Sequence, residues 1–207
     1  MKISSKKSLK LVTHDGSFHS DDIFAAATLQ IYLEKKGEAF EIIRTRDEEI
    51  IKNGDFVFDV GGIYDEKNNR FDHHQVGGAG KRENNIPYSS FGLVWQKFGI
   101  EIAGSGDTAD FVEQKLVTPV DANDNGIDLF QGNFPDILAY TVQDVFAIFS
   151  PTALESLEKD EQFAKALVWA KEILRREIKK ANEQTEIRKI IRDFYTKTKD
   201  KRLSVFC

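Results

Sequence analysis

Histidine and aspartate residues gather in two short stretches of this 207-residue sequence, 13–22 and 71–75. The stretches hold all four histidines of the chain, which are His14, His19, His73 and His74. Imidazole mixed with carboxylate is the ligand set of Mn, Fe, Co or Zn rather than of Ca, which prefers oxygen ligands. Neither stretch contains a cysteine, so a closed structural zinc site with thiolate ligands is not expected. The two stretches therefore predict a divalent-metal site.

The aspartates that accompany these histidines are too many for a single cation. The candidates are Asp15, Asp21, Asp59, Asp72 and one of the pair Asp121 and Asp124. Gathering so many carboxylates is costly unless two divalent ions, about 3.5–4 Å apart, neutralise them. A pair of divalent ions is suited to in-line attack on phosphorus, because it stabilises both the nucleophile and the developing charge.

The adjacent histidines are expected to have different tasks. In extended backbone, neighbouring side chains point to opposite faces, so His73 and His74 would not chelate one metal together. We expect one of them to bind metal and the other to face the substrate.

Plainer interpretations exist for each of these residues alone. Asp15 is a natural turn former beside Gly16, and Asp21 or Asp22 is placed to cap a helix. A single histidine such as His14 often bonds a loop carbonyl. These interpretations do not explain why every histidine of the chain lies close to an aspartate, so we favour the metal site.

The elements that must position these residues alternate between strand and helix. Apolar periodicity and caps predict, in order, a strand at 9–13, a helix at 20–36 ended by Gly37, a strand at 40–44, a short helix capped by Asp47, and a strand at 56–58. This alternation predicts an α/β fold with a mainly parallel sheet and helices on its faces. Ligands of such sheets bind at the carboxyl ends of the strands, where His14 and Asp59 stand.

The rest of the chain is expected to be mostly helical. After an extended segment at 68–72 and a mobile glycine-rich loop at 77–81, we expect helices at 89–98, 108–117 and 135–150, and two tail helices within 153–198 that break near Asn182. Residues 1–150, with 15 Lys and Arg against 24 Asp and Glu, form the expected catalytic domain. Residues 151–207, with 14 against 10, form a basic helical appendage.

Composition limits the class of protein. With 41% hydrophobic and 30% charged residues, and no apolar run near the roughly 20 residues of a spanning helix, a globular protein without membrane partners is expected. The single cysteine, Cys207, fits a reducing compartment, so a cytoplasmic location is expected. The chain has a net charge of −5, and its acidic body, residues 1–150, would repel nucleic acid unless metal ions or local basic groups invert the field at one place.

Five blocks of sequence resemble a known family. They read HDGSFHSDD at 14–22, FDVGG at 58–62, RFDHHQ at 70–75, SSFGLVW at 89–95 and VDANDNGI at 120–127. The triplet Asp72-His73-His74 resembles that of the DHH phosphoesterase superfamily, and the five blocks together are similar to the melanocyte-proliferating-gene family of metal-dependent hydrolases. The resemblance implies a three-layer α/β/α DHH-type domain that binds two Mn²⁺-like ions, with Mg²⁺, Co²⁺ or Zn²⁺ as alternatives.

The resemblance also implies roles for single residues. Metal ligands would be His14 or Asp15, His19, Asp21, Asp59 as the bridging carboxylate, His73, and Asp121 with Asp124 as its competitor. His74 would face the phosphate. We expect Lys81 and Arg82, on the glycine-rich loop, to contact the phosphate too. Basic residues of the tail helices are either further phosphate contacts or a solvated face.

The expected activity is hydrolysis of phosphodiesters. Eukaryotic relatives of the family act as RNA exonucleases, which favours short oligonucleotides as substrates. A small phosphate compound such as a nucleotide or pyrophosphate, and a non-catalytic metal-binding relative, are the alternatives. Members of the family are generally longer, and this chain ends on what looks like the start of a strand, 203–206, whose edge would suit a homodimer.

Overall fold

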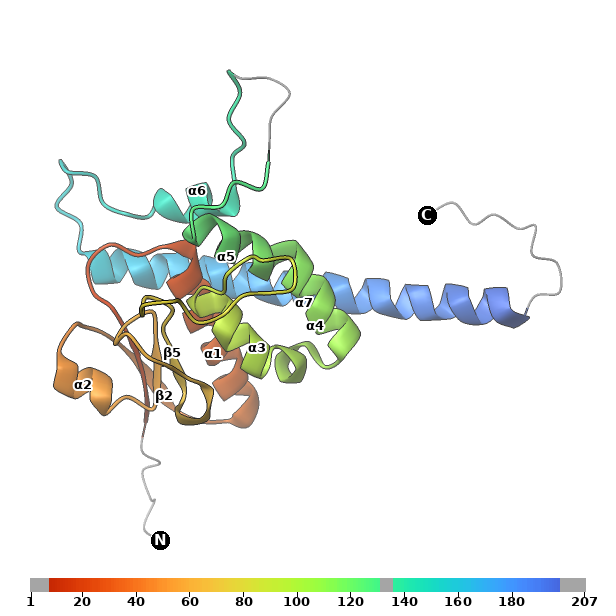
Figure 1. Ribbon diagram of the computed structural model, residues 1–207, viewed down its shortest axis with the longest axis horizontal. Helices are drawn as coiled ribbons and strands as arrows, with labels where there is room; N and C mark the ends of the chain where they lie inside the picture. Colours follow the sequence, from red (N-terminus) through yellow and green to blue (C-terminus); the bar gives the residue numbers. More distant parts are fainter. Residues whose placement is uncertain (1–7, 131–135, 198–207) are drawn as a thin grey trace, which may run out of the picture.

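The protein has an α/β fold built on one five-stranded sheet (Figure 1). The computed structural model describes residues 8–130 and 136–197. The strand order is β2-β1-β3-β5-β4. The strands are β1 Leu9–Thr13, β2 Phe40–Arg44, β3 Phe56–Phe58, β4 Tyr64–Asp65 and β5 Arg70–Phe71. The first three lie where the apolar pattern predicts them.

The sheet is parallel except at one edge. Strand β1 pairs in parallel with both β2 and β3, and β3 pairs in parallel with β5. Strand β4 runs antiparallel to β5 and closes the edge, after which a 3-10 turn, Glu66–Asn68, leads back into β5. The predicted mainly parallel sheet is therefore confirmed, and the carboxyl ends of β1, β3 and β5 lie next to one another.

Helices cover both faces of the sheet. Helices α1 (Ser20–Lys36) and α3 (Ser90–Ala103) pack against one face and each other, and the ring of Phe24 stacks on that of Phe91 at 5.0 Å. On the other face, the short helix α2 (Glu48–Lys52) brings Ile51 onto a small cluster around Val12 and Val57. Gly37 ends α1 with a φ of 67°, and the Asp47 carboxylate caps α2, both as predicted.

The helix expected at 108–117 is longer and irregular. Helix α4, Gly106–Val112, continues through one π-helical turn, Glu113–Val117, into α5, Thr118–Asp124. Pro119, which has no N–H to donate, lies just after the π-helical turn. The continuation matters for function, because Asp121 and Asp124 stand on α5 rather than in a loop.

Two helical predictions for the second half of the chain are wrong. Within the described part of the segment expected to be helical over 135–150, only Val142–Ala147 is helical, as α6, and the described tail forms one helix, α7, Lys159–Lys197, instead of two. The side chain of Asn182 bonds the Ala103 carbonyl and the Thr108 hydroxyl, and so ties α7 to α3 and α4 without a break.

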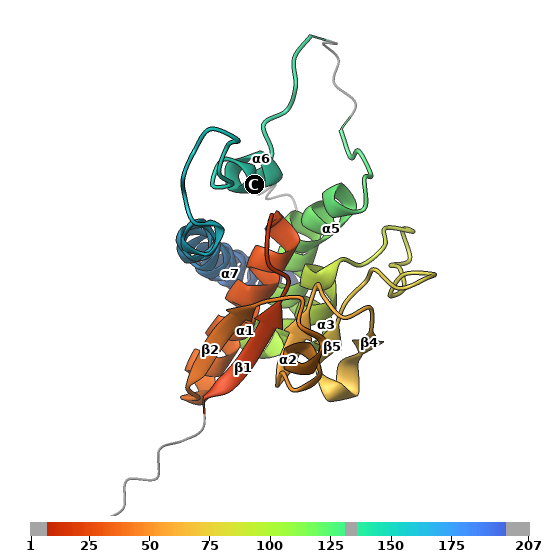
Figure 2. The same ribbon diagram turned by 90° about the vertical axis from the view of Figure 1, so that its left-hand side faces the viewer.

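Helix α7 lies on α1 on the side away from α3 (Figure 2), and its first half shares the main hydrophobic core. Its C-terminal part runs on beyond the body of the molecule (Figure 1). The expected beginning of a strand at 203–206 lies outside the described residues. No helix in the described ranges has the length and apolarity needed to cross a membrane.

Candidate metal centre

The predicted histidines and aspartates meet at the carboxyl edge of the sheet. His14 follows β1, Asp59 follows β3, and the triplet Asp72–His74 follows β5. The first turn of α1 adds Asp21 and Asp22, and the end of α5 adds Asp124. Five segments of the chain thus contribute to one cluster.

One part of the cluster is centred on His14, which is buried. Its Nε2 atom lies 3.0 Å from Oδ2 of Asp59 and 3.2 Å from Oδ2 of Asp22. Its Nδ1 atom lies 3.0 Å from the carbonyl of Asp15. Potential ligand atoms of His14, Asp22 and Asp59 all lie within 4.8 Å of one another, so these three residues could hold a cation.

A second part lies on the other side of Asp59. Ligand atoms of His19, Asp21 and Asp124 also lie within 4.8 Å of one another. His73 stands between the two parts, with its Nε2 atom 3.3 Å from Oδ1 of Asp59 and 3.3 Å from Oδ2 of Asp124. Asp59 therefore reaches His14 with one oxygen and His73 with the other.

Asp59 is held in an uncommon backbone conformation. Its φ of 55° lies in the left-handed region, which an aspartate tolerates better than most residues but still at a cost. The Ser90 hydroxyl donates to Oδ1 at 3.0 Å and fixes the carboxylate from α3. The sharp turn after β3 thereby points the Asp59 side chain into the middle of the cluster.

His73 and His74 do not follow the alternation expected of a strand. Strand β5 ends at Phe71, so both histidines lie in a loop, and their rings are 4.2 Å apart. The structure therefore corrects the premise of extended backbone: ligand atoms of His73, His74 and Asp59 all lie within 4.8 Å of one another. The two side chains nevertheless differ in exposure, which is 9% for His73 and 62% for His74.

Asp72 orients the exposed histidine. Its Oδ1 atom lies 2.7 Å from Nδ1 of His74 and also accepts from the backbone N–H of His74. Its Oδ2 atom accepts from the backbone N–H of Gly62 at 2.6 Å. Since both oxygens are engaged, Asp72 positions His74 and the turn after β3.

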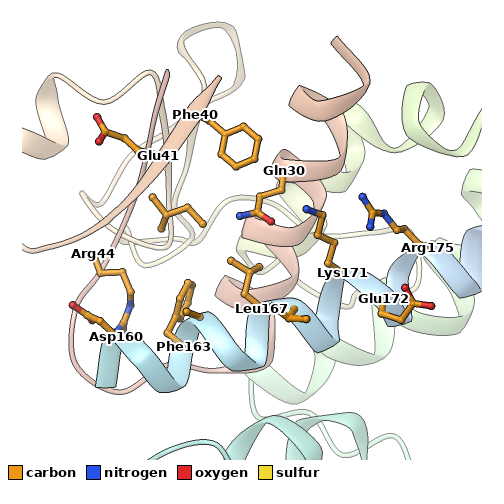
Figure 3. A pocket seen from close by; sticks show the side chains of 13 residues that line it. Gln30, Phe40, Glu41, Arg44, Asp160, Phe163, Leu167, Lys171, Glu172 and Arg175 are labelled. Carbon is orange, nitrogen blue, oxygen red and sulfur yellow. The ribbon is translucent and has the colours of Figure 1, made fainter. Parts of the chain in front are cut away.

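The side chains of Arg44 and Gln143 hold the segments that carry the cluster. The Arg44 guanidinium donates to the Gly16 carbonyl at 2.9 Å, faces the Phe163 ring at 4.5 Å and pairs with Asp160, so α7 supports the loop between β1 and α1 (Figure 3). At the start of α1, the Gln143 side-chain oxygen accepts from both the backbone and the hydroxyl of Ser20.

The protonation of the cluster reflects crowded acidic groups. Burial by itself lowers the pKa of His14, but the bonds and charges of Asp22 and Asp59 outweigh burial and raise that pKa to about 10. Burial raises the pKa of Asp21 well above its ordinary value, and the charges of Asp59 and Asp124 raise it further. Burial also raises the pKa of Asp59, yet His14 and His73 more than reverse this, so it lies well below the ordinary value.

The donor atoms of the cluster fit a divalent cation. Both carboxylate oxygens of Asp21 and the Nε2 atom of His73 are buried and have no hydrogen-bond partner in the part of the chain that the structure describes. Buried polar atoms are nearly always paired, so such atoms call for an explanation. A cation between carboxylate and imidazole groups would satisfy them and compensate for the negative charge.

Several predicted site residues lie apart from this cluster. The Asp121 carboxylate accepts from the Ser89 hydroxyl at 2.5 Å, from the Gly92 N–H at 3.0 Å and from the Arg82 guanidinium at 2.7 Å. Arg82 also donates to Glu113 at 2.6 Å, so this predicted phosphate contact is engaged in an ion-pair network. We call these residues, Arg82, Ser89, Gly92, Glu113 and Asp121, the Arg82 network.

The two other outlying residues are solvent-exposed. Asp15 is turned outward and pairs with Arg46 at 3.2 Å; the two side chains are 55% and 67% exposed. Lys81 is exposed on its loop and pairs through its backbone with Pro87. Neither Asp15 nor Asp121 belongs to a group of described residues that could hold a metal.

Asp22 and Ser90 contact the cluster although the sequence pattern does not indicate them, and Asp124 does so although the pattern indicates Asp121 first. The pattern indicates a helix cap at Asp21 or Asp22, and the Oδ1 atom of Asp22 does accept from the backbone of His19. The other oxygen points to His14. Asp124 lies one helical turn after Asp121 on α5. This spacing indicates Asp124 only when the extent of α5 is known.

The cluster opens into a cleft of about 650 Å³, which we call the metal cleft, lined among others by His14, His19, Asp59, Asp72 and His74. A larger hollow of about 750 Å³ lies between β2 and α7, with Phe40, Leu167 and Lys171 on its walls (Figure 3). That hollow contains no histidine, so we place the candidate site in the metal cleft.

Comparison with known proteins identifies relatives over most of the chain. The family model MYG1_exonuc, described as "Uncharacterised protein family (UPF0160)", matches residues 10–206. The chain is 33% identical over 184 residues to a MYG1 protein of Chlamydia pneumoniae, covering 87% of this chain and 58% of that one. It is 33% identical over 162 residues to the MYG1 exonuclease of Homo sapiens, covering 69% of this chain and 43% of that one.

The chain spans about half the length of these relatives. The MYG1 exonuclease of Bos taurus is 34% identical to the chain over 162 residues, which cover 42% of its own length. No solved structure matches the chain.

Proposed function

Because the chain belongs to the MYG1_exonuc family, we propose that it is a divalent-metal-dependent phosphodiester hydrolase that acts on short oligonucleotides. The relatives from Homo sapiens and Bos taurus are named MYG1 exonucleases, which supports a nuclease-type hydrolase. The observation that carries the proposal is that buried carboxylate and imidazole atoms of Asp21 and His73, which crowd together beside the metal cleft, form no hydrogen bond with a described residue. Burial of these atoms costs free energy unless a ligand compensates for it, so their burial supports a bound ligand.

Two cations are proposed, one for each part of the cluster. His14 and Asp22 would hold the first, and His19, Asp21 and Asp124 the second. Asp59 suits the bridging role, because its two oxygens face the two parts. Mn²⁺ is the ion we propose, since mixed histidine and aspartate ligands suit it. When bound, the ions would supply Lewis-acid stabilisation of charge on the phosphoryl oxygens.

The residues of the chain would orient the substrate. His74 is fixed by Asp72 through Nδ1 and lines the metal cleft with most of its side chain exposed, which supports a contact with the phosphate. His73 is buried among the carboxylates, which supports a ligand role. The Asp72–His74 triplet after a parallel strand is also the basis on which we propose membership of the DHH superfamily.

The test compares substrates and metal states of the unmodified protein. We expect the Mn²⁺-loaded protein to release nucleotides from a dinucleotide and from short RNA, to cleave pyrophosphate much more slowly, and to lose activity in EDTA. Faster cleavage of pyrophosphate would favour a small-molecule phosphatase. Tight Mn²⁺ binding without turnover of any of these substrates would show a metal-binding protein that lacks catalysis.

A further inference from the structure

The metal cleft contains one arginine that the proposed function has not used. Among the described residues lining the cleft, Arg46 is the only lysine or arginine; the acidic or imidazole side chains there are those of His14, Asp15, His19, Asp59, Asp72 and His74. Arg46 follows β2 and stands at the rim, with its side chain 67% exposed. Its ion pair with Asp15 joins two exposed groups and is weak enough to be exchanged for an anionic ligand.

Arg46 also lines a second hollow that adjoins the metal cleft. This hollow, of about 660 Å³, shares Arg46, Val60 and Gly61 with the cleft. It extends over α2 and the β3–β5 side of the sheet to Lys52 and Arg70. We call it the side hollow. Because three lining residues are common to both spaces, a chain-like ligand can pass from one to the other beside Arg46.

Besides Arg46, the side hollow carries two cations that pair with no acidic residue in the described part of the chain. Neither Lys52 nor Arg70 forms an ion pair with a described residue, and the Arg70 guanidinium donates instead to carbonyl groups, among them those of Asn68 and Lys52. Of the two acidic residues that line the hollow, Asp65 is engaged as the cap of the turn after β4, and Glu48 is exposed on α2. The positive charge at this place is therefore available to an anion.

The side hollow also offers apolar surface. Ile51, Val57, Val60 and Ile63 line it, and Ile63 is 56% exposed. Proteins that bind single-stranded nucleic acid combine cations that follow the backbone with apolar or aromatic surfaces that contact bases. A small phosphate compound would need only the metal cleft, whereas a strand would need the connected space beyond it.

We propose that the side hollow binds the continuing strand of a single-stranded oligonucleotide whose reacting phosphate lies in the metal cleft. Arg46 contacts the phosphate at the junction, and Lys52 contacts the next one. The inference rests on the proposed function, because it takes the metal cleft as the place of reaction. The sequence predicts a phosphate contact by Arg82, but the Arg82 guanidinium is engaged with Asp121 and Glu113. In this proposal Arg46 makes the phosphate contact instead.

The experiment measures binding and turnover separately, so that the two proposals fail in different ways. Fluorescence anisotropy gives the affinity of the Mn²⁺-loaded protein for labelled phosphorothioate RNA of two and of five nucleotides, whose modified linkages slow cleavage. The variants are Arg46→Gln and Lys52→Gln, and Lys165→Gln, which removes an exposed charge from α7, is the matched control. Manganese content is measured for each variant.

We expect the five-nucleotide RNA to bind more tightly than the dinucleotide. Lys52→Gln should weaken binding of the longer RNA about fivefold, reduce its salt dependence by a slope of about 0.7, and leave the dinucleotide unchanged. Arg46→Gln should weaken both about tenfold or more at unchanged manganese content. Lys165→Gln should change neither.

Equal binding of the two RNAs, undetectable binding of both, or a length preference that survives Lys52→Gln would overturn the inference. Failure of the proposed function has a different signature. Ordinary RNA would then stay uncleaved in Mn²⁺, whatever the binding results are. A length preference that depends on Lys52, without any turnover, would leave the side hollow as a strand-binding site and would refute the hydrolase.

Discussion

Asp121 and Asp124 lie one turn apart on α5, yet their surroundings differ in kind. Asp121 is fully buried, and its oxygens accept bonds from Ser89, Gly92 and Arg82. Asp124 faces Asp21, His19 and His73, and both oxygens of Asp21 lack a hydrogen-bond partner in the described part of the chain. The Asp121 carboxylate in the Arg82 network thus has hydrogen bonds and a counter-charge, whereas the Asp21 carboxylate in the histidine–aspartate cluster has no hydrogen bond from a described residue.

The difference links the Arg82 network to the stability of the fold and the histidine–aspartate cluster to function. Removal of one partner from a buried ion pair strongly destabilises the fold, because the other partner is left buried without a counter-charge. An unsatisfied acidic cluster, by contrast, costs stability in the metal-free protein and is explained by the ligand that completes it. We therefore expect substitutions in the cluster to lower metal binding and activity, and substitutions in the Arg82 network to lower the free energy of unfolding.

The largest expected effect is that of Asp59→Asn on activity. Asp59 joins both parts of the cluster, so the variant should lose more than about a hundredfold in hydrolysis of a dinucleotide in Mn²⁺ while it remains folded. Turnover assays and circular dichroism check this. Undiminished turnover would contradict the bridging role of Asp59.

In the Arg82 network, Arg82→Met should act on stability. It leaves the carboxylates of Asp121 and Glu113 without their counter-charge, so the free energy of unfolding should fall by about 3 kcal/mol. Urea denaturation measures the change, and manganese content should be unaltered. If stability is unchanged and affinity for the substrate falls, Arg82 contacts the phosphate after all and the comparison breaks down.

Within the cluster, Asp21→Asn should raise the free energy of unfolding of the metal-free protein, whereas Arg82→Met lowers it. It removes a buried carboxylate that burial and the neighbouring Asp59 and Asp124 disfavour in the charged form. The metal-free protein should become more stable by about 1–2 kcal/mol, while its Mn²⁺ affinity falls. Thermal unfolding in EDTA and manganese titration test the two halves of this prediction; a loss of stability in EDTA would show that Asp21 is needed by the fold itself.

The last prediction concerns the pH dependence of stability, which is spread over several pH units. The folded-state pKa of His14, about 10, lies above its ordinary value of 6.5, so its contribution to stability is complete below pH 6.5 and is lost as pH rises through 10. The metal-free protein should therefore lose at most about 1.4 kcal/mol per pH unit in that window from this residue. His14→Gln should flatten the slope. Stabilisation by Mn²⁺ should grow with pH, because metal binding displaces the proton.

The local part of the fold could be predicted from the sequence. Apolar runs and caps placed β1, β2 and β3, the end of α1 at Gly37 and the Asp47 cap, because these features depend on neighbours in the sequence. The break expected near Asn182 was wrong for the opposite reason. Its amide bonds Ala103 and Thr108, about 75 to 80 residues earlier, and no local pattern reports such contacts.

The site was predictable by residue type and less so by position. Histidine confined to two stretches indicated the cluster, and the structure brings all four histidines to it. The choice between Asp121 and Asp124 depended on which face of α5 meets α3: a Cβ atom at Gly92 would lie 1.9 Å from Asp121, so only glycine allows that helix contact. Such close packing is a tertiary property.

The central claim is that the unpartnered carboxylates around Asp59 hold metal, and crystals grown with Mn²⁺ test it most directly. Diffraction measured at the manganese absorption edge locates the ion without reference to activity. The account predicts anomalous peaks on both sides of Asp59, one beside His14 and Asp22 and one beside Asp21 and Asp124. Absence of anomalous density from both places in crystals grown with saturating Mn²⁺ would contradict it.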